Sequence, residues 1–132
     1  MKVAFAPVLV MGLCITASCL AAENVFISNK LHWQKALSYC QTHYRDLSYV
    51  RSDAEVTQLL NVMNTKQMSW IGLSRHGSSW QWTNGAPLTY HNWAPGQPHH
   101  DHNCVSTASG LWYTNDCNAN QPFYCCLPSS RP

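Results

Sequence analysis

The stretch SWIGLSRHGSSWQWTNG, residues 69–85, indicates how the second half of this chain folds. It opens with the short apolar run Trp70-Ile71-Gly72-Leu73, and Gly77 separates this run from Trp80-Gln81-Trp82, which alternates as a strand does. Asn84-Gly85 then predicts a turn, because both residues tolerate a positive φ. The stretch therefore predicts two short strands joined and followed by turns.

Two helices are predicted before this stretch. Apolar residues recur at helical spacing within residues 31–42, namely Trp33, Ala36, Leu37 and Cys40, so that Cys40 faces the core. A second helix begins at Ser52, which forms an S-x-x-E capping box with Glu55. Its buried stripe is expected to comprise Val56, Leu59, Leu60 and Met63.

A long irregular loop is predicted after the turn. Residues 86–103 contain Pro87, Pro95, Gly96 and Pro98 and show little periodicity. An irregular loop of this length is uncommon inside a compact domain and often carries function. Further short strands are expected around 104–107, 111–113 and 121–125.

The N-terminus has the pattern of a secretory signal peptide over residues 1–22. Lys2 precedes the apolar segment 3–20, and the small residues Ala21 and Ala22 offer a cleavage site before Glu23. A membrane anchor is the alternative, but polar and helix-breaking residues shorten the apolar core. The prediction is a secreted domain over residues 23–132, without a later membrane span.

Composition excludes several classes of function. The sequence has 8 Lys and Arg residues against 6 Asp and Glu, which gives a formal net charge of +2. This balance provides no basic stripe to neutralise phosphates, so nucleic-acid binding is not predicted. G-x-S-x-G, phosphate-loop and H-E-x-x-H motifs are absent from the sequence, so an enzyme is not predicted.

Cysteine usage agrees with export. Of 7 cysteines, the predicted mature chain keeps Cys40, Cys104, Cys117, Cys125 and Cys126, and in a secreted chain these are expected to form disulfides. One thiol is left over. It is either buried, paired between chains, or joined to Cys19 if cleavage falls after Ala17.

Taken together, these features resemble the C-type lectin-like domain, and especially short secreted single-domain lectins of the fish and venom type. The residues that carry the resemblance are Trp33-x-x-Ala36-x-x-x-Cys40, Asp46-Leu47, Trp70-Ile71-Gly72-Leu73, Trp80-x-Trp82-x-x-Gly85, Asn92-Trp93, Gly96-Gln97-Pro98, Cys104, Gly110-x-Trp112, Cys117 and Pro122-Phe123-x-Cys125. The resemblance implies an α+β fold with two helices, small antiparallel sheets, a long loop and disulfides Cys40–Cys125 and Cys104–Cys117. It also implies that the protein recognises glycans or other proteins, as in innate immunity.

The remaining cysteine, Cys126, is then expected to be unpaired. Neighbouring side chains on a strand point to opposite faces, so Cys126 should face outward if Cys125 faces the core. This predicts a disulfide-linked homodimer through Cys126.

The family's sugar-binding members hold one Ca²⁺ in the long loop, and their ligand positions fall here on Gln97, His99, His102, Tyr113 and Thr114. This set contains no carboxylate, and imidazole suits Ca²⁺ poorly. A rearranged calcium site could use the oxygens of Gln97, Asp101, Asn103, Asn115 and Asp116. The residues expected to contact the bound ligand are Gln97, His99, His102, Asn115 and Asp116. The calcium site is therefore predicted to be degenerate.

The histidines of the loop allow a different metal. His99, His100 and His102 could bind Zn²⁺, which imidazole suits. Two other interpretations of this cluster stay open. It can be a solvated polar loop tip without a ligand, or it can form a contact with a partner that changes when the imidazoles gain a proton near pH 6.5.

Two functions remain open at this point. One is carbohydrate binding by a secreted, non-enzymatic C-type lectin module. The other is a lectin-like module that binds a cell-surface or secreted protein without sugar or Ca²⁺.

Overall fold

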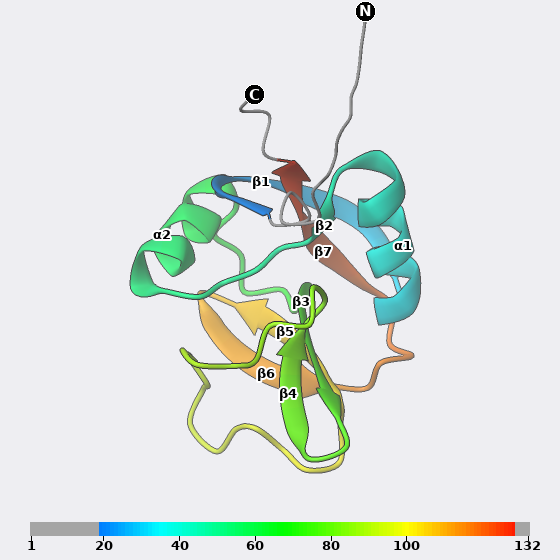
Figure 1. Ribbon diagram of the computed structural model, residues 1–132, viewed down its shortest axis with the longest axis vertical. Coiled ribbons are helices and arrows are strands. Elements are labelled where there is room, and N and C mark those ends of the chain that lie inside the picture. The colour runs from blue at the N-terminus through cyan, green and yellow to red at the C-terminus, as the bar shows by residue number, and fades with distance from the viewer. Residues whose placement is uncertain (1–18, 129–132) are drawn as a thin grey trace, which may run out of the picture.

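The computed structural model describes residues 19–128, and its sheet is organised around strand β7 (Gln121–Pro128). This strand pairs antiparallel with β1 (Cys19–Leu31) and β2 (Asp46–Leu47), and parallel with β3 (Ser69–His76). Strand β3 then pairs antiparallel with β4 (Ser79–Trp82) and β5 (Cys104–Ala108), and β5 pairs with β6 (Leu111–Asn115). Figure 1 shows β1 and β7 at the end near both termini, and β3 to β6 at the other.

The two predicted helices are present, as α1 (Trp33–His43) and α2 (Asp53–Val62). The Ser52 hydroxyl caps α2 by accepting from the Glu55 amide at 3.1 Å, as the sequence predicts. The Glu55 carboxylate, however, accepts from the amide of Arg51 and not from that of Ser52. Leu59 is buried, whereas Met63 lies just past the helix and is 38% exposed, so its place in the buried stripe was predicted wrongly.

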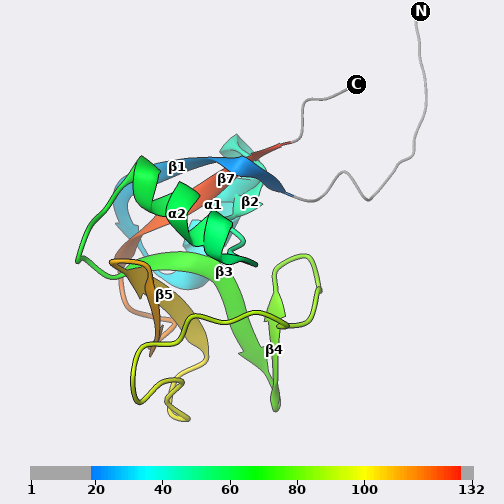
Figure 2. The same ribbon diagram turned by 90° about the vertical axis from the view of Figure 1, so that its left-hand side faces the viewer.

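The hydrophobic core lies on both faces of β7. On one face, Phe123 and Cys125 pack with Trp33, Ala36 and Cys40 of α1. On the other face, Tyr124 and Cys126 pack with Leu59 of α2 and with Trp82 and Trp112. Figures 1 and 2 show β7 running between the two helices.

This arrangement corrects the prediction for Cys126. Cys125 and Cys126 do point to opposite faces of β7, but both faces are covered and both side chains are fully buried. Cys126 is also disulfide-bonded, so it is not the outward-facing free thiol expected from strand alternation. A disulfide-linked homodimer through Cys126 loses its basis, because the thiol it needs is neither free nor accessible.

The two other predicted disulfides are confirmed. Cys40–Cys125 joins α1 to β7, and Cys104–Cys117 closes the segment that contains β5 and β6.

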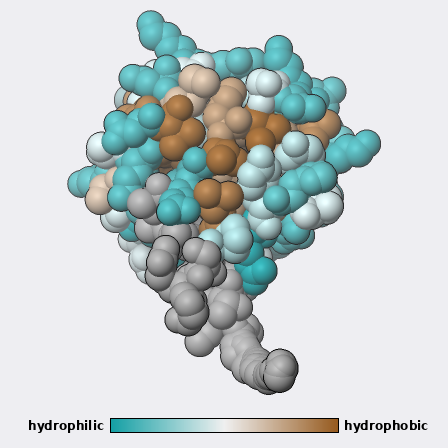
Figure 3. All heavy atoms as spheres, turned by 90° about the horizontal axis from the view of Figure 1, so that it is seen from above, coloured by the Kyte–Doolittle hydropathy of each residue, from teal (hydrophilic) through white to brown (hydrophobic). Residues whose placement is uncertain are grey.

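Strand β1 begins at Cys19, inside the predicted leader, and its backbone pairs there with Pro128. Cleavage before Glu23 stays a prediction. Neither α1 nor α2 is long and apolar enough to cross a membrane. The face seen from above gathers apolar side chains at its centre within a hydrophilic rim (Figure 3), at the end of the molecule away from the long loop.

Candidate functional site

The long loop between β4 and β5 spans residues 83–103 and lies at the end of the molecule opposite both termini (Figures 1 and 2). Its base rests on an aromatic cluster in which Trp93 packs against Trp112 at 5.5 Å and against Trp80 at 5.2 Å between ring centroids. The Cys104–Cys117 disulfide fixes the point where the loop enters β5. The loop is therefore irregular in backbone but anchored at its base.

Gln97 connects the loop to strand β6. Its side-chain oxygen accepts hydrogen bonds from the Thr114 amide at 3.0 Å and from the Thr114 hydroxyl at 2.9 Å. The same hydroxyl accepts from the amide of His99 at 3.1 Å. The peptide bond between Gln97 and Pro98 is cis. Thr114, 5% exposed, thus holds the residues on both sides of Pro98.

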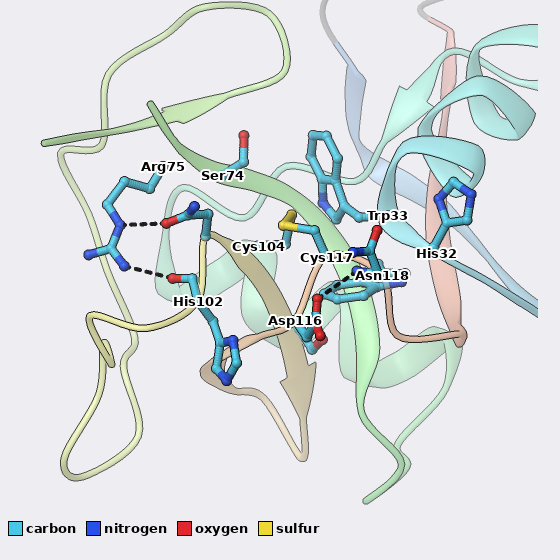
Figure 4. The surroundings of a disulfide bond; sticks show 12 residues. His32, Trp33, Ser74, Arg75, His102, Cys104, Asp116, Cys117 and Asn118 are labelled. Carbon is cyan, nitrogen blue, oxygen red and sulfur yellow. Dashed lines mark hydrogen bonds between the residues drawn. A yellow bond between two sulfur atoms is a disulfide. The ribbon is translucent and has the colours of Figure 1, made fainter. Parts of the chain in front are cut away.

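Arg75 holds the loop from β3. Its Nη2 atom donates to the backbone carbonyls of His99, His100 and His102 at 3.2, 2.8 and 2.7 Å. Its Nε atom donates to the Asn103 side chain at 3.1 Å, and its guanidinium lies over the Trp80 ring at 4.8 Å from the centroid. Figure 4 shows Arg75 reaching toward His102, with a dashed line between the two residues. One guanidinium therefore orders the backbone of residues 99–103.

These contacts decide whether the family's Ca²⁺ fits. Ca²⁺ needs six to eight oxygens, several of them carboxylate. The Gln97 oxygen is taken by Thr114, and His99 and His102 offer nitrogen. The remaining family positions, Tyr113 and Thr114, carry no carboxylate either. These residues do not fit Ca²⁺.

The rearranged oxygen set is not brought together either. The Asn103 oxygen accepts from Arg75, whose positive charge disfavours a cation beside it. Asp116 Oδ1 accepts from the Asn118 amide at 2.9 Å, and Figure 4 shows Asp116 turned toward Asn118. Asn115 is half-buried, and its Nδ2 atom is buried without a hydrogen-bond partner in the described part of the chain. Asp101 groups instead with two histidines.

That group forms the exposed tip of the loop. Asp101 Oδ2 lies 3.6 Å from His99 Nδ1, and Asp101 Oδ1 lies 3.3 Å from His100 Nε2. The His99 and His100 rings stack at 5.1 Å with 11° between their planes. His102, predicted as the third histidine, is half-buried, and its ring lies 6.4 Å from that of His99.

A further contact anchors the start of the loop. The Tyr90 hydroxyl donates to Asp53 Oδ1, in the first turn of α2, at 2.5 Å. Burial first, and then the hydrogen bond and charge of Asp53, raise the pKa of Tyr90 to about 12. Tyr90 also packs edge-on against Trp112. Tyr90 therefore attaches the start of the loop to α2 and to the aromatic core.

Sequence reasoning missed Arg75. Its acceptors are mostly backbone carbonyls 24 to 27 residues away, and no local pattern signals such a contact.

The model of the Lectin C-type domain matches residues 29–127. The chain belongs to the C-type lectin domain family. The resemblance seen in the sequence is thereby confirmed, and so is the fold class.

Among curated relatives, this C-type lectin domain is 33% identical over 119 residues to lymphocyte antigen 75 of Mesocricetus auratus, covering 84% of the chain but 7% of that protein. Among solved structures, it resembles the carbohydrate-recognition domain of the mouse scavenger receptor C-type lectin. The TM-score is 0.72 and the identity 26%, over 77% of this chain and 86% of that one.

It also resembles the cow CD23 carbohydrate-recognition domain, whose structure was solved with a GlcNAc2Man3 oligosaccharide. The TM-score is 0.73 and the identity 27%, over 86% of this chain and 98% of that one.

Proposed function

We propose that this domain is a secreted, non-enzymatic recognition module that binds carbohydrate through the long loop, without the Ca²⁺ geometry of its family. Two structurally similar domains are carbohydrate-recognition domains, and one was solved with an oligosaccharide. The sequence features of a leader peptide support secretion.

One observation carries the proposal: hydrogen bonds from Arg75 and Thr114 hold the loop tip in place. Arg75 binds the carbonyls of His99, His100 and His102, and Thr114 binds Gln97 and the His99 amide. A site that is ordered before binding loses little conformational entropy when a ligand arrives.

The tip offers groups suited to a sugar. The Asp101 side chain is 61% exposed and accepts hydrogen bonds, as hydroxyl-rich ligands require. The imidazoles of His99 and His100 can donate or accept, and their side chains are 51% and 87% exposed. Trp80 and Tyr90, in contrast, pack against Trp93 and Trp112 and support the base of the loop.

The test is retention of the purified protein on immobilised galactose and mannose, with Ca²⁺ and again with a chelator. We expect retention on at least one sugar that persists in chelator and weakens in Asp101→Asn. His91→Ala, an exposed histidine of the same loop outside the tip, is the matched control and should be retained like the wild type. Retention that the chelator abolishes would contradict the proposed mode of binding. Absence of retention in both conditions would contradict carbohydrate binding on these sugars and favour a protein ligand.

A further inference from the structure

Three side chains at the loop tip present metal-binding atoms at close range. One ligand atom from each of His99, His100 and Asp101 lies within 4.8 Å of the other two. The described residues contain no other group of three or more His, Cys, Asp or Glu side chains with this property. Asp101 Oδ2 lies 3.6 Å from His99 Nδ1, and the other carboxylate oxygen, Oδ1, lies 3.3 Å from His100 Nε2.

The donor types of this cluster suit one class of ion. Zn²⁺ binds imidazole nitrogen and carboxylate oxygen at about 2.0–2.2 Å in a tetrahedron, whose ligand atoms are then about 3.3–3.6 Å apart. Two nitrogens and one carboxylate suit Zn²⁺ or a related transition-metal dication, whereas Ca²⁺ and Mg²⁺ prefer oxygen alone. The three ligand atoms, now within 4.8 Å of one another, have to draw closer by rotation of their exposed side chains to share an ion.

The backbone beneath the cluster is already fixed. The carbonyls of His99 and His100 accept from Arg75, and the His99 amide donates to Thr114. The Asp101 amide donates to His99 Nδ1 in a long, exposed hydrogen bond of 3.4 Å, which the exposed ring has to leave before this nitrogen can bind an ion. Metal binding therefore does not have to order the loop.

The cluster is also open to solvent. All three residues are exposed, so an ion held by three protein ligands would keep at least one position for water or an external group. His102 is not among the residues of the cluster: its ring centroid lies 6.4 Å from that of His99, and its carbonyl accepts from Arg75.

We propose that His99, His100 and Asp101 form a surface site for Zn²⁺ or a similar transition-metal dication, with an open coordination position. This site goes beyond the proposed carbohydrate binding, and it can exist whether or not a sugar binds. It replaces the histidine trio suggested by the sequence with two histidines and a carboxylate.

The experiment is calorimetric titration of Zn²⁺ into untagged, chelator-stripped wild-type protein in sugar-free buffer. We expect saturable binding of one ion per chain, which excess Ca²⁺ does not displace. His99→Ala and His100→Ala each remove one of three ligands, and Asp101→Asn removes the negative charge of the third, so each should weaken binding at least about tenfold. His91→Ala should bind like the wild type.

A second readout keeps the test independent of folding. Circular dichroism confirms that each variant is folded, and NMR follows the imidazole signals during the titration. Zn²⁺ should shift the signals of His99 and His100 and leave that of His91 in place. Lack of saturable binding, equal binding by the folded His99→Ala variant, or selective shifts of other histidines would each overturn the proposal. Because sugar is absent throughout, these outcomes are separate from the fate of the carbohydrate proposal.

Discussion

The side-chain oxygen of Gln97 accepts two hydrogen bonds from Thr114, one from its amide at 3.0 Å and one from its hydroxyl at 2.9 Å. In the family's sugar-binding members, both positions correspond to Ca²⁺ ligands. Here the two residues bind each other. Together with Arg75, this pair holds the long loop by contacts within the protein.

Thr114→Val should destabilise the domain. Valine keeps the shape of threonine but removes the hydroxyl that binds Gln97 and the His99 amide, in a position that is 5% exposed. The free energy of unfolding, measured by urea denaturation, should fall by about 1–3 kcal/mol, as expected for buried polar groups that lose a partner. Thr89→Val, on an exposed threonine of the same loop, is the control. Equal effects of the two variants would mean that Thr114 does not anchor the loop.

Arg75→Lys should loosen the loop tip while leaving the domain folded. Lysine keeps the positive charge but lacks the planar fork that reaches several carbonyls and Asn103 at once. Limited proteolysis with subtilisin should cleave within residues 95–103 faster in this variant. Arg51→Lys, where the guanidinium lies over Tyr49 away from this loop segment, should be cleaved like the wild type. Unchanged cleavage in Arg75→Lys would show that the positive charge at this position is enough to hold the loop tip, without the guanidinium fork.

Removing the Cys104–Cys117 disulfide should cost about 3 kcal/mol of unfolding free energy, as the loop-entropy model gives for short closed segments. The two residues are 13 apart in sequence, and the bond joins the start of β5 to the segment after β6. Urea denaturation without reductant measures this loss of unfolding free energy, by comparing the wild type with the double variant that has alanine at both positions. A change well under 1 kcal/mol would indicate that the bond is not needed to hold the loop base.

Alkaline pH should weaken the attachment of the loop to α2. The pKa of Tyr90 is raised from 10.0 to about 12, so the folded state favours the neutral phenol. The resulting stabilisation is complete below pH 10 and is lost as the pH rises from 10 through 12. Asp53→Asn removes the charge and should lower the pKa of Tyr90, measured by NMR titration of tyrosine ring carbons. The pKa of Tyr124, which burial raises to about 12, should stay unchanged and serves as the internal control.

Much of the fold could be predicted because its signals are local. The helical spacing of Trp33, Ala36 and Cys40 places them on the buried face of α1, and the Ser52 cap marks the start of α2. Both disulfides were implied by the family resemblance and are present.

The failures have a common physical cause. Strand alternation placed Cys126 on the face opposite Cys125, but it could not show that a second layer covers that face. Met63 follows the helical spacing, yet α2 ends one residue earlier. In each case the missing information is tertiary packing.

The candidate site could be predicted only in part. The loop and its unusual residues are visible in the sequence, and so is the lack of carboxylates at the family positions. The hydrogen bonds of Arg75 are not visible in the sequence, because they join a residue of β3 to backbone carbonyls of a distant loop. Asp101 was expected among oxygen ligands, and the structure places its two oxygens beside the nitrogens of two stacked imidazoles.

The most direct measurement is amide hydrogen exchange of residues 97–103 in chelator and again with saturating Ca²⁺. Because Arg75 and Thr114 hold the loop, we expect the His99 amide to be protected equally in both conditions. Rapid exchange in chelator that becomes slow when Ca²⁺ is added would contradict this account, since the loop would then owe its order to the ion.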